Sequence, residues 1–123
     1  MLSGCGIENP ALVQRYDGPY VEQPYIYGDR CVQANGMNIC YTTAGEGPPL
    51  IFLRGVGGTV DYWHETMPAF TDDFTVYALD MPGFGKSDKP DCDYSVAFFT
   101  ETLLAFMDAE GIQRASIVGN SLG

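Results

Sequence analysis

The segment Ala115-Ser116-Ile117-Val118-Gly119-Asn120-Ser121-Leu122-Gly123 decides which fold the sequence predicts. A short apolar run predicts a strand, and the last five residues match the pattern G-x-S-x-G. In that pattern the serine stands on a tight strand-to-helix turn in strained backbone geometry, which exposes its hydroxyl. Gly119 and Gly123 flank it because a β-carbon at either position would collide with the neighbouring strand or helix. We interpret Ser121 as a candidate nucleophile, although the five residues alone also fit a plain glycine–serine loop.

The composition is that of one modest globular domain. The chain has 123 residues, of which 46% are hydrophobic and 18% are charged. Sixteen acidic residues against six Lys and Arg give a net charge of −10. Such a surface repels phosphate backbones, so we expect no nucleic-acid partner and attribute the charge to solubility. No run approaches the ~18 apolar residues that a membrane-spanning helix needs.

The first part of the chain differs from the rest. Residues 1–27 are rich in Pro, Gly and Tyr and show neither helical nor strand periodicity. We assign them to a leader or linker whose composition is compatible with disorder. Residues 28–123 form the N-terminal, incomplete part of a folded domain.

The cysteines leave two questions open. Leu2-Ser3-Gly4-Cys5 resembles the lipobox of bacterial lipoproteins, but no apolar segment precedes it, so a chance match is the alternative. The expected location is cytoplasmic, or that of a bacterial lipoprotein if an upstream signal peptide was lost, with membrane contact only through Cys5. Cys5, Cys31, Cys40 and Cys92 lack metal-ligand spacing, and we expect free thiols, with disulfides as the alternative.

The middle of the chain alternates predicted strands and helices. Asn35-Gly36 predicts a two-residue type I′ turn between strands at residues 31–34 and 37–42. Further strands are expected at residues 50–53, 74–79 and 115–119, with helices at 60–70 and from Ser95 to Gly111. This order predicts a mostly parallel sheet with helices on both faces. Loops 54–58, 80–88 and 120–123 should then converge on one pocket.

The chain resembles the N-terminal part of an α/β-hydrolase-fold protein. The markers are Leu53-Arg54-Gly55, then Trp63 and Pro68, then Asp80-Met81-Pro82-Gly83-Phe84-Gly85-Lys86-Ser87-Asp88, and finally Gly119 to Gly123. The resemblance is to the serine-nucleophile branch, which contains esterases, meta-cleavage-product hydrolases and monoacylglycerol-lipase-like enzymes. Haloalkane dehalogenases and epoxide hydrolases carry Asp at the position of Ser121, which disfavours those two activities.

The resemblance implies a role for each matching residue. Ser121 would attack the carbonyl of an ester or related acyl bond in a small, partly apolar substrate and form an acyl-enzyme. The backbone N–H groups of Leu122 and Val56 would form the oxyanion hole. Gly55 would let the loop backbone approach substrate, and Gly119 and Gly123 would permit the turn. The resemblance implies no metal and no organic cofactor. It does not predict an oligomeric state.

Two departures from the family pattern keep an alternative open. Arg54 stands where the family commonly has His, so it could brace the loop or meet an anionic group of the substrate. The acid and histidine that complete the family's triad are absent from residues 1–123, because His64 lies in the predicted first helix and Asp80 is expected to shape its own loop. The fragment alone should therefore be inactive and marginally folded, with Ile117 and Val118 incompletely covered. The alternative function is a non-catalytic binding or sensor module.

Overall fold

The computed structural model describes residues 13–14, 24–54, 60–121 and 123 of the chain. Its main sheet has five strands in the order β2-β3-β5-β4-β7, and a separate two-stranded sheet pairs β1 with β6. The strands of the main sheet are β2 (Arg30–Ala34), β3 (Met37–Gly45), β4 (Pro49–Arg54), β5 (Thr75–Leu79) and β7 (Ser116–Asn120). The small sheet consists of β1 (Val13–Gln14) and β6 (Lys89–Pro90), and the helices are η2 (Val60–Trp63), η3 (Met67–Ala69) and α1 (Val96–Ala109).

The main sheet is mixed, and its parallel part carries the site. β2 pairs antiparallel with β3 and β3 antiparallel with β5, whereas β4 runs parallel to both β5 and β7. The expected parallel arrangement therefore holds for the three strands β5, β4 and β7. These strands end at the same edge, so the segments that follow them lie close together.

The β2–β3 hairpin forms as predicted, and its register pairs two cysteines. Asn35 and Gly36 both have positive φ angles, 53° and 77°, as a type I′ turn requires. Cys31 lies four residues before the turn and Cys40 four residues after it, so the two stand directly opposite each other. They form a disulfide with Cα atoms 4.0 Å apart, and Cys92 is also disulfide-bonded. The expectation of free thiols is therefore wrong for these three cysteines.

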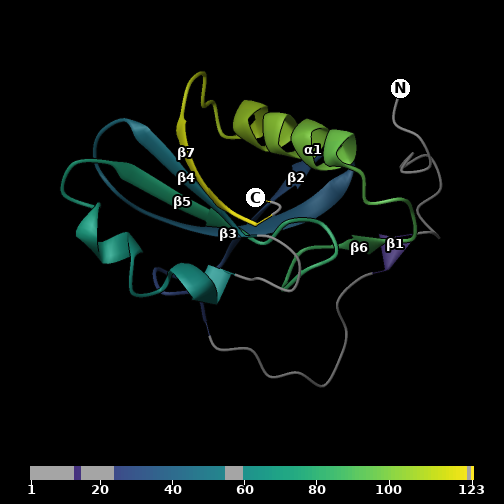
Figure 1. The fold of residues 1–123 in the computed structure, drawn as a ribbon, viewed down its shortest axis with the longest axis horizontal. Coiled ribbons are helices and arrows are strands. Elements are labelled where there is room, and N and C mark those ends of the chain that lie inside the picture. Colours follow the sequence, from purple (N-terminus) through teal and green to yellow (C-terminus); the bar gives the residue numbers. More distant parts are fainter. Residues whose placement is uncertain (1–12, 15–23, 55–59, 122) are drawn as a thin grey trace.

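The core lies on both faces of the sheet. Along β4, Leu50 and Phe52 belong to one cluster of buried apolar residues, and Ile51 and Leu53 belong to the other. The alternation follows from the two-residue period of a strand, and it explains why the strand is a continuous apolar run. Figure 1 shows α1 over one face and the two 3-10 helices beneath the other.

The sheet edge at β7 is incompletely covered. Ile117 and Val118 are 50% and 37% exposed, in contrast to the buried residues of the neighbouring strand β4. This exposure agrees with the expectation that these two side chains lack part of their cover. The structure therefore offers an apolar surface beside the segment that carries Ser121.

The helix predicted at residues 60–70 is wrong. The segment contains two short 3-10 helices, η2 and η3, which are closed by bonds to the residue three positions back, from the His64 N–H to Asp61 and from the Phe70 N–H to Met67. Pro68 explains the difference, because it has no N–H to donate and disfavours α geometry at the residue before it. The later helix is confirmed: the Ser95 hydroxyl accepts a bond from the Phe98 N–H, and Gly111 follows the end with φ 69°.

Some of the sequence-based assignments fall outside the described residues. Cys5 and the lipobox are among them, and the division at residue 27 stays a prediction. Tyr25, inside the predicted leader, is nevertheless buried in the core, with 5% of its surface exposed. Among the described helices, none combines the length and the apolar character needed to cross a membrane.

The disulfide leads to a prediction for stability. Closing a loop between residues separated by 9 positions contributes about 2.5 kcal/mol by restricting the unfolded chain. Replacing Cys31 and Cys40 together with Ala in the whole protein should lower the free energy of unfolding by about that amount. Denaturant titration without reductant measures it. If both thiols of the unreduced wild-type protein react with an alkylating reagent, the disulfide is contradicted.

Candidate active site

The end of β7 turns sharply at Ser121. Ser121 has φ 59°, a left-handed conformation that a residue with a β-carbon adopts at a cost of about 1 kcal/mol or more. The turn is closed by a hydrogen bond of 3.1 Å from the Gly123 N–H to the Asn120 carbonyl. Ser121 is exposed, so its hydroxyl group is open to solvent at the carboxyl end of the strand. This is the geometry that the G-x-S-x-G pattern predicts.

The two glycines are required by close backbone contacts. A β-carbon on Gly119 would lie 2.3 Å from the carbonyl oxygen of Gly123. A β-carbon on Gly123 would lie 2.4 Å from the carbonyl oxygen of Leu53, at the end of β4. Both contacts are with backbone atoms, which cannot rotate away as a flexible side chain can. The expected steric reason for the two glycines is thus present, and it links the turn to β4 as well as to β7.

The parallel register brings a second residue to the turn. Arg54, the last residue of β4, stands opposite Asn120, the last residue of β7. The Arg54 Nη1 group donates a hydrogen bond to the Asn120 side-chain oxygen, and the guanidinium carbon lies 3.6 Å from the centre of the Tyr62 ring. Of the roles considered for Arg54, these contacts favour bracing of the site. The sequence reasoning did not identify Asn120 or Tyr62 as its partners.

Three predicted site residues lie outside the described part of the chain. They are Gly55, Val56 and Leu122. Their neighbours are described: Arg54 directly precedes Gly55, and Ser121 and Gly123 enclose Leu122. The oxyanion roles of Val56 and Leu122 therefore stay predictions.

Asp80 organises the loop after β5 from a buried position. Only 1% of its surface is exposed, and its carboxylate accepts hydrogen bonds from the Val60 N–H at 2.8 Å, the Lys86 N–H at 2.9 Å and the Tyr25 hydroxyl. Burial raises the pKa of Asp80 above its ordinary value, while these hydrogen bonds act to lower it. A carboxylate engaged by three donors organises its surroundings, which agrees with the expectation that Asp80 shapes its own loop.

The remaining part of that loop is fixed along β3. The Asn38 N–H donates to the Asp88 carboxylate at 2.8 Å, and the Cys40 N–H donates to the Ser87 hydroxyl at 2.8 Å. Because β3 belongs to the rigid sheet, the loop has a defined position. The segment from Asp80 to Asp88 thereby forms a firm wall near the end of β4.

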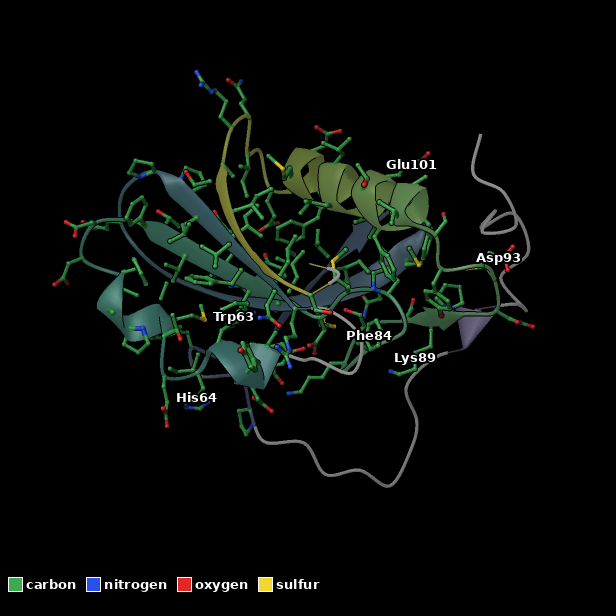
Figure 2. All side chains as sticks on the ribbon, in the orientation of Figure 1. Trp63, His64, Phe84, Lys89, Asp93 and Glu101 are labelled. Carbon is green, nitrogen blue, oxygen red and sulfur yellow. A yellow bond between two sulfur atoms is a disulfide. The ribbon has the colours of Figure 1, made fainter. Side chains whose placement is uncertain are left out.

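His64 lies apart from this arrangement. It follows η2, is exposed, and points away from the sheet in Figure 2. This position agrees with the sequence-based interpretation that His64 does not complete the triad. Among the described residues, no group of three or more His, Cys, Asp or Glu side chains could hold a metal ion.

A cavity of about 230 Å³ lies beside the turn. Each of the three loops expected to converge contributes to its wall: Arg54 from loop 54–58, Met81 and Phe84 from loop 80–88, and Gly123 from loop 120–123. Apolar side chains of α1 and β7 supply most of the rest: Phe99, Leu103 and Ile117. The convergence predicted from the strand order is therefore confirmed for the described residues.

Residues 48–123 match the family model described as the alpha/beta hydrolase fold. This chain belongs to the alpha/beta hydrolase family. It is 37% identical, over 79% of its length, to 2-hydroxy-6-oxo-6-(2'-aminophenyl)hexa-2,4-dienoic acid hydrolase of Metapseudomonas resinovorans, covering 35% of that protein.

Two solved structures have the same fold as this chain. One is a mutant of the meta-cleavage product hydrolase from Pseudomonas fluorescens IP01, complexed with acetates. It superposes with a TM-score of 0.73 and is 36% identical, and the match covers 76% of this chain and 36% of that one. A membrane phospholipase A described as a bacterial virulence factor gives 0.75 at 34% identity, over 78% and 32%. The chain thus spans about a third of the length of each of these three proteins. Two of the three are named as hydrolases, and the third is named as a phospholipase.

The contacts of Gly123 lead to a prediction for the turn. Gly123→Ala in the whole protein should lower the free energy of unfolding by at least about 2 kcal/mol, because the new methyl group overlaps a backbone oxygen. The matched control is Gly111→Ala, where a β-carbon meets nothing within 4 Å and only the positive φ of 69° is unfavourable. That control should cost about 1 kcal/mol. Equal losses in the two variants, measured by denaturant titration, would contradict the close approach to Leu53.

Proposed function

We propose that the whole protein is a serine hydrolase that cleaves an ester or related acyl bond through an acyl-enzyme on Ser121. The observation that carries the proposal is the left-handed backbone of Ser121, at φ 59°, in an exposed turn at the end of a parallel strand. Backbone strain of this kind persists only where surrounding contacts impose it, and it is concentrated at functional sites. Hydrolases among the relatives support the same reaction class.

The reaction would proceed by acyl transfer in two steps. The Ser121 oxygen attacks the substrate carbonyl, its proton passes to a general base, and the leaving alcohol departs with a proton. Water then attacks the acyl-enzyme, and the acid product leaves as the serine recovers its proton. In this family the base is a histidine held by an acid, and both follow the nucleophile in the chain. This chain's His64, exposed beyond η2, does not fill that position.

The developing oxyanion would be bound by backbone N–H groups. We assign these donors to Leu122 and Val56, the residues that the family pattern places after the nucleophile and in the loop after β4. Support comes from the ends of β4 and β7, which lie in register at Arg54 and Asn120. The two proposed donors thus follow, in the sequence, strand ends that lie side by side in the sheet.

The substrate is proposed to be small and partly apolar. The cavity beside the turn is walled largely by apolar side chains, with Arg54 as its charged member. Both carboxylic esters and the carbon–carbon bonds cleaved by meta-cleavage-product hydrolases belong to the proposed class. Covalent and acid–base catalysis of this kind needs neither a metal nor an organic cofactor.

Steady-state hydrolysis of p-nitrophenyl acetate by the whole protein tests the proposal. Ser121→Ala should lower kcat/KM by at least ~10⁴-fold, because it removes the nucleophile. Ser116→Ala is the matched control, since Ser116 is an exposed serine at the start of the same strand. Its activity should remain within about twofold of wild type.

Two results would overturn the proposal. Turnover retained by the folded Ser121→Ala variant would place the nucleophile elsewhere. No turnover by the folded wild-type protein, with any of a panel of short and long acyl esters, would favour the non-catalytic binding module instead.

A further inference from the structure

We propose that Arg54 is a positioning residue of the hydrolase site, and that it holds Asn120 so that Ser121 keeps its placement relative to the end of β4. The inference rests on the proposed function, since it assigns a residue to the same site. Arg54 occupies a position where the family commonly has His, so its role here comes from its own contacts.

Two contacts restrict the guanidinium group. One edge donates from Nη1 to the Asn120 side-chain oxygen, and one face lies on the Tyr62 ring at 3.6 Å. A charged donor makes a stronger hydrogen bond than a neutral one, and stacking on an aromatic face orients the planar group. Together they fix both the position and the plane of the group.

The Tyr62 ring is itself supported. Although Tyr62 is 51% exposed, its ring meets Trp63 edge-on, with ring centres 4.9 Å apart and planes at 88°. Trp63 is 6% exposed and packs against Phe52 of β4 at 5.0 Å between ring centres. Arg54 is thus stacked on a ring that is tied, through Trp63, to the core beneath β4.

The contact with Asn120 reaches the nucleophile through the backbone. Asn120 directly precedes Ser121, and its carbonyl accepts the hydrogen bond from Gly123 that closes the turn. Arg54 in turn directly precedes the loop at residues 55–59, to which the proposed oxyanion donor Val56 belongs. The hydrogen bond from Arg54 to Asn120 therefore joins the end of β4 to the residue that directly precedes the proposed nucleophile.

Lysine should not replace this arginine. A lysine ammonium is a compact point charge without a planar fork, so it cannot stack on Tyr62 and bond Asn120 in the same way. Small displacements at a reacting centre cost up to ~10²-fold in rate. The loss should appear mainly in kcat, because the guanidinium group is engaged by Asn120 and Tyr62 and acts on the placement of Ser121.

The experiment measures kcat and KM of the whole protein for p-nitrophenyl acetate, a neutral ester. Arg54→Ala and Arg54→Lys should each lower kcat by about 10- to 100-fold while KM changes by less than about threefold. Asn120→Ala should have a similar effect, and Arg54→Ala/Asn120→Ala should be no slower than either single variant, because the two residues act as one unit. Arg114→Ala, which removes an exposed arginine beyond α1, is the matched control.

A second measurement separates positioning from a merely structural role. Guanidinium chloride at millimolar concentration should restore part of kcat in Arg54→Ala, whereas sodium chloride at the same ionic strength should not. Tyr62→Leu, which keeps the arginine but removes the ring, should also lower kcat. If Arg54→Ala does not fold, Tyr62→Leu and Arg54→Lys test the same proposal, with thermal melting as the folding control.

The outcomes distinguish this inference from the proposed function. Wild-type kcat in folded Arg54→Ala, together with inactivity of Ser121→Ala, would overturn the role of Arg54 and leave the hydrolase intact. Inactivity of the wild-type protein would overturn both. A rise in KM confined to esters that carry a carboxylate, with kcat unchanged for the neutral ester, would assign Arg54 to binding an anionic substrate and would also overturn the positioning role.

Discussion

The parallel pairing of β4 with β7 is the constraint on which the site depends. It places Leu53 opposite Gly119 and Arg54 opposite Asn120. The turn after β7 then approaches the end of β4 so closely that position 123 has no room for a β-carbon. This close approach confines the turn in which Ser121 has its left-handed backbone conformation.

The rest of the described structure holds β4 in place. Its alternate residues are buried in both apolar clusters, and burial on two faces leaves the strand little freedom. Asp80 connects three separate segments on the same side of the site, through Tyr25, Val60 and the Lys86 backbone. β4 is thus fixed by packing on both faces, and β7 is held to it by their parallel pairing.

Local sequence signals predicted the elements, whereas contacts between distant segments had to come from the structure. Asn35-Gly36 and the capping residue Ser95 gave correct elements because their effect is confined to neighbouring residues. Pro68 is also a local signal, and it disfavours the continuous helix predicted at residues 60–70. The Cys31–Cys40 disulfide could have been found, since a two-residue turn sets the two residues opposite each other. The bonds from Tyr25 to Asp80 and from Arg54 to Asn120 could not, because they join residues 55 and 66 positions apart.

The most direct test of the account is to locate the atom that reacts. The whole protein is treated with a fluorophosphonate ester, digested, and its peptides are examined by mass spectrometry. A serine activated by a neighbouring base forms a stable phosphonyl adduct, so the account predicts one adduct, on the peptide that contains Ser121. An adduct on another residue, or a folded protein that acquires none, would contradict the assignment of Ser121 as the nucleophile.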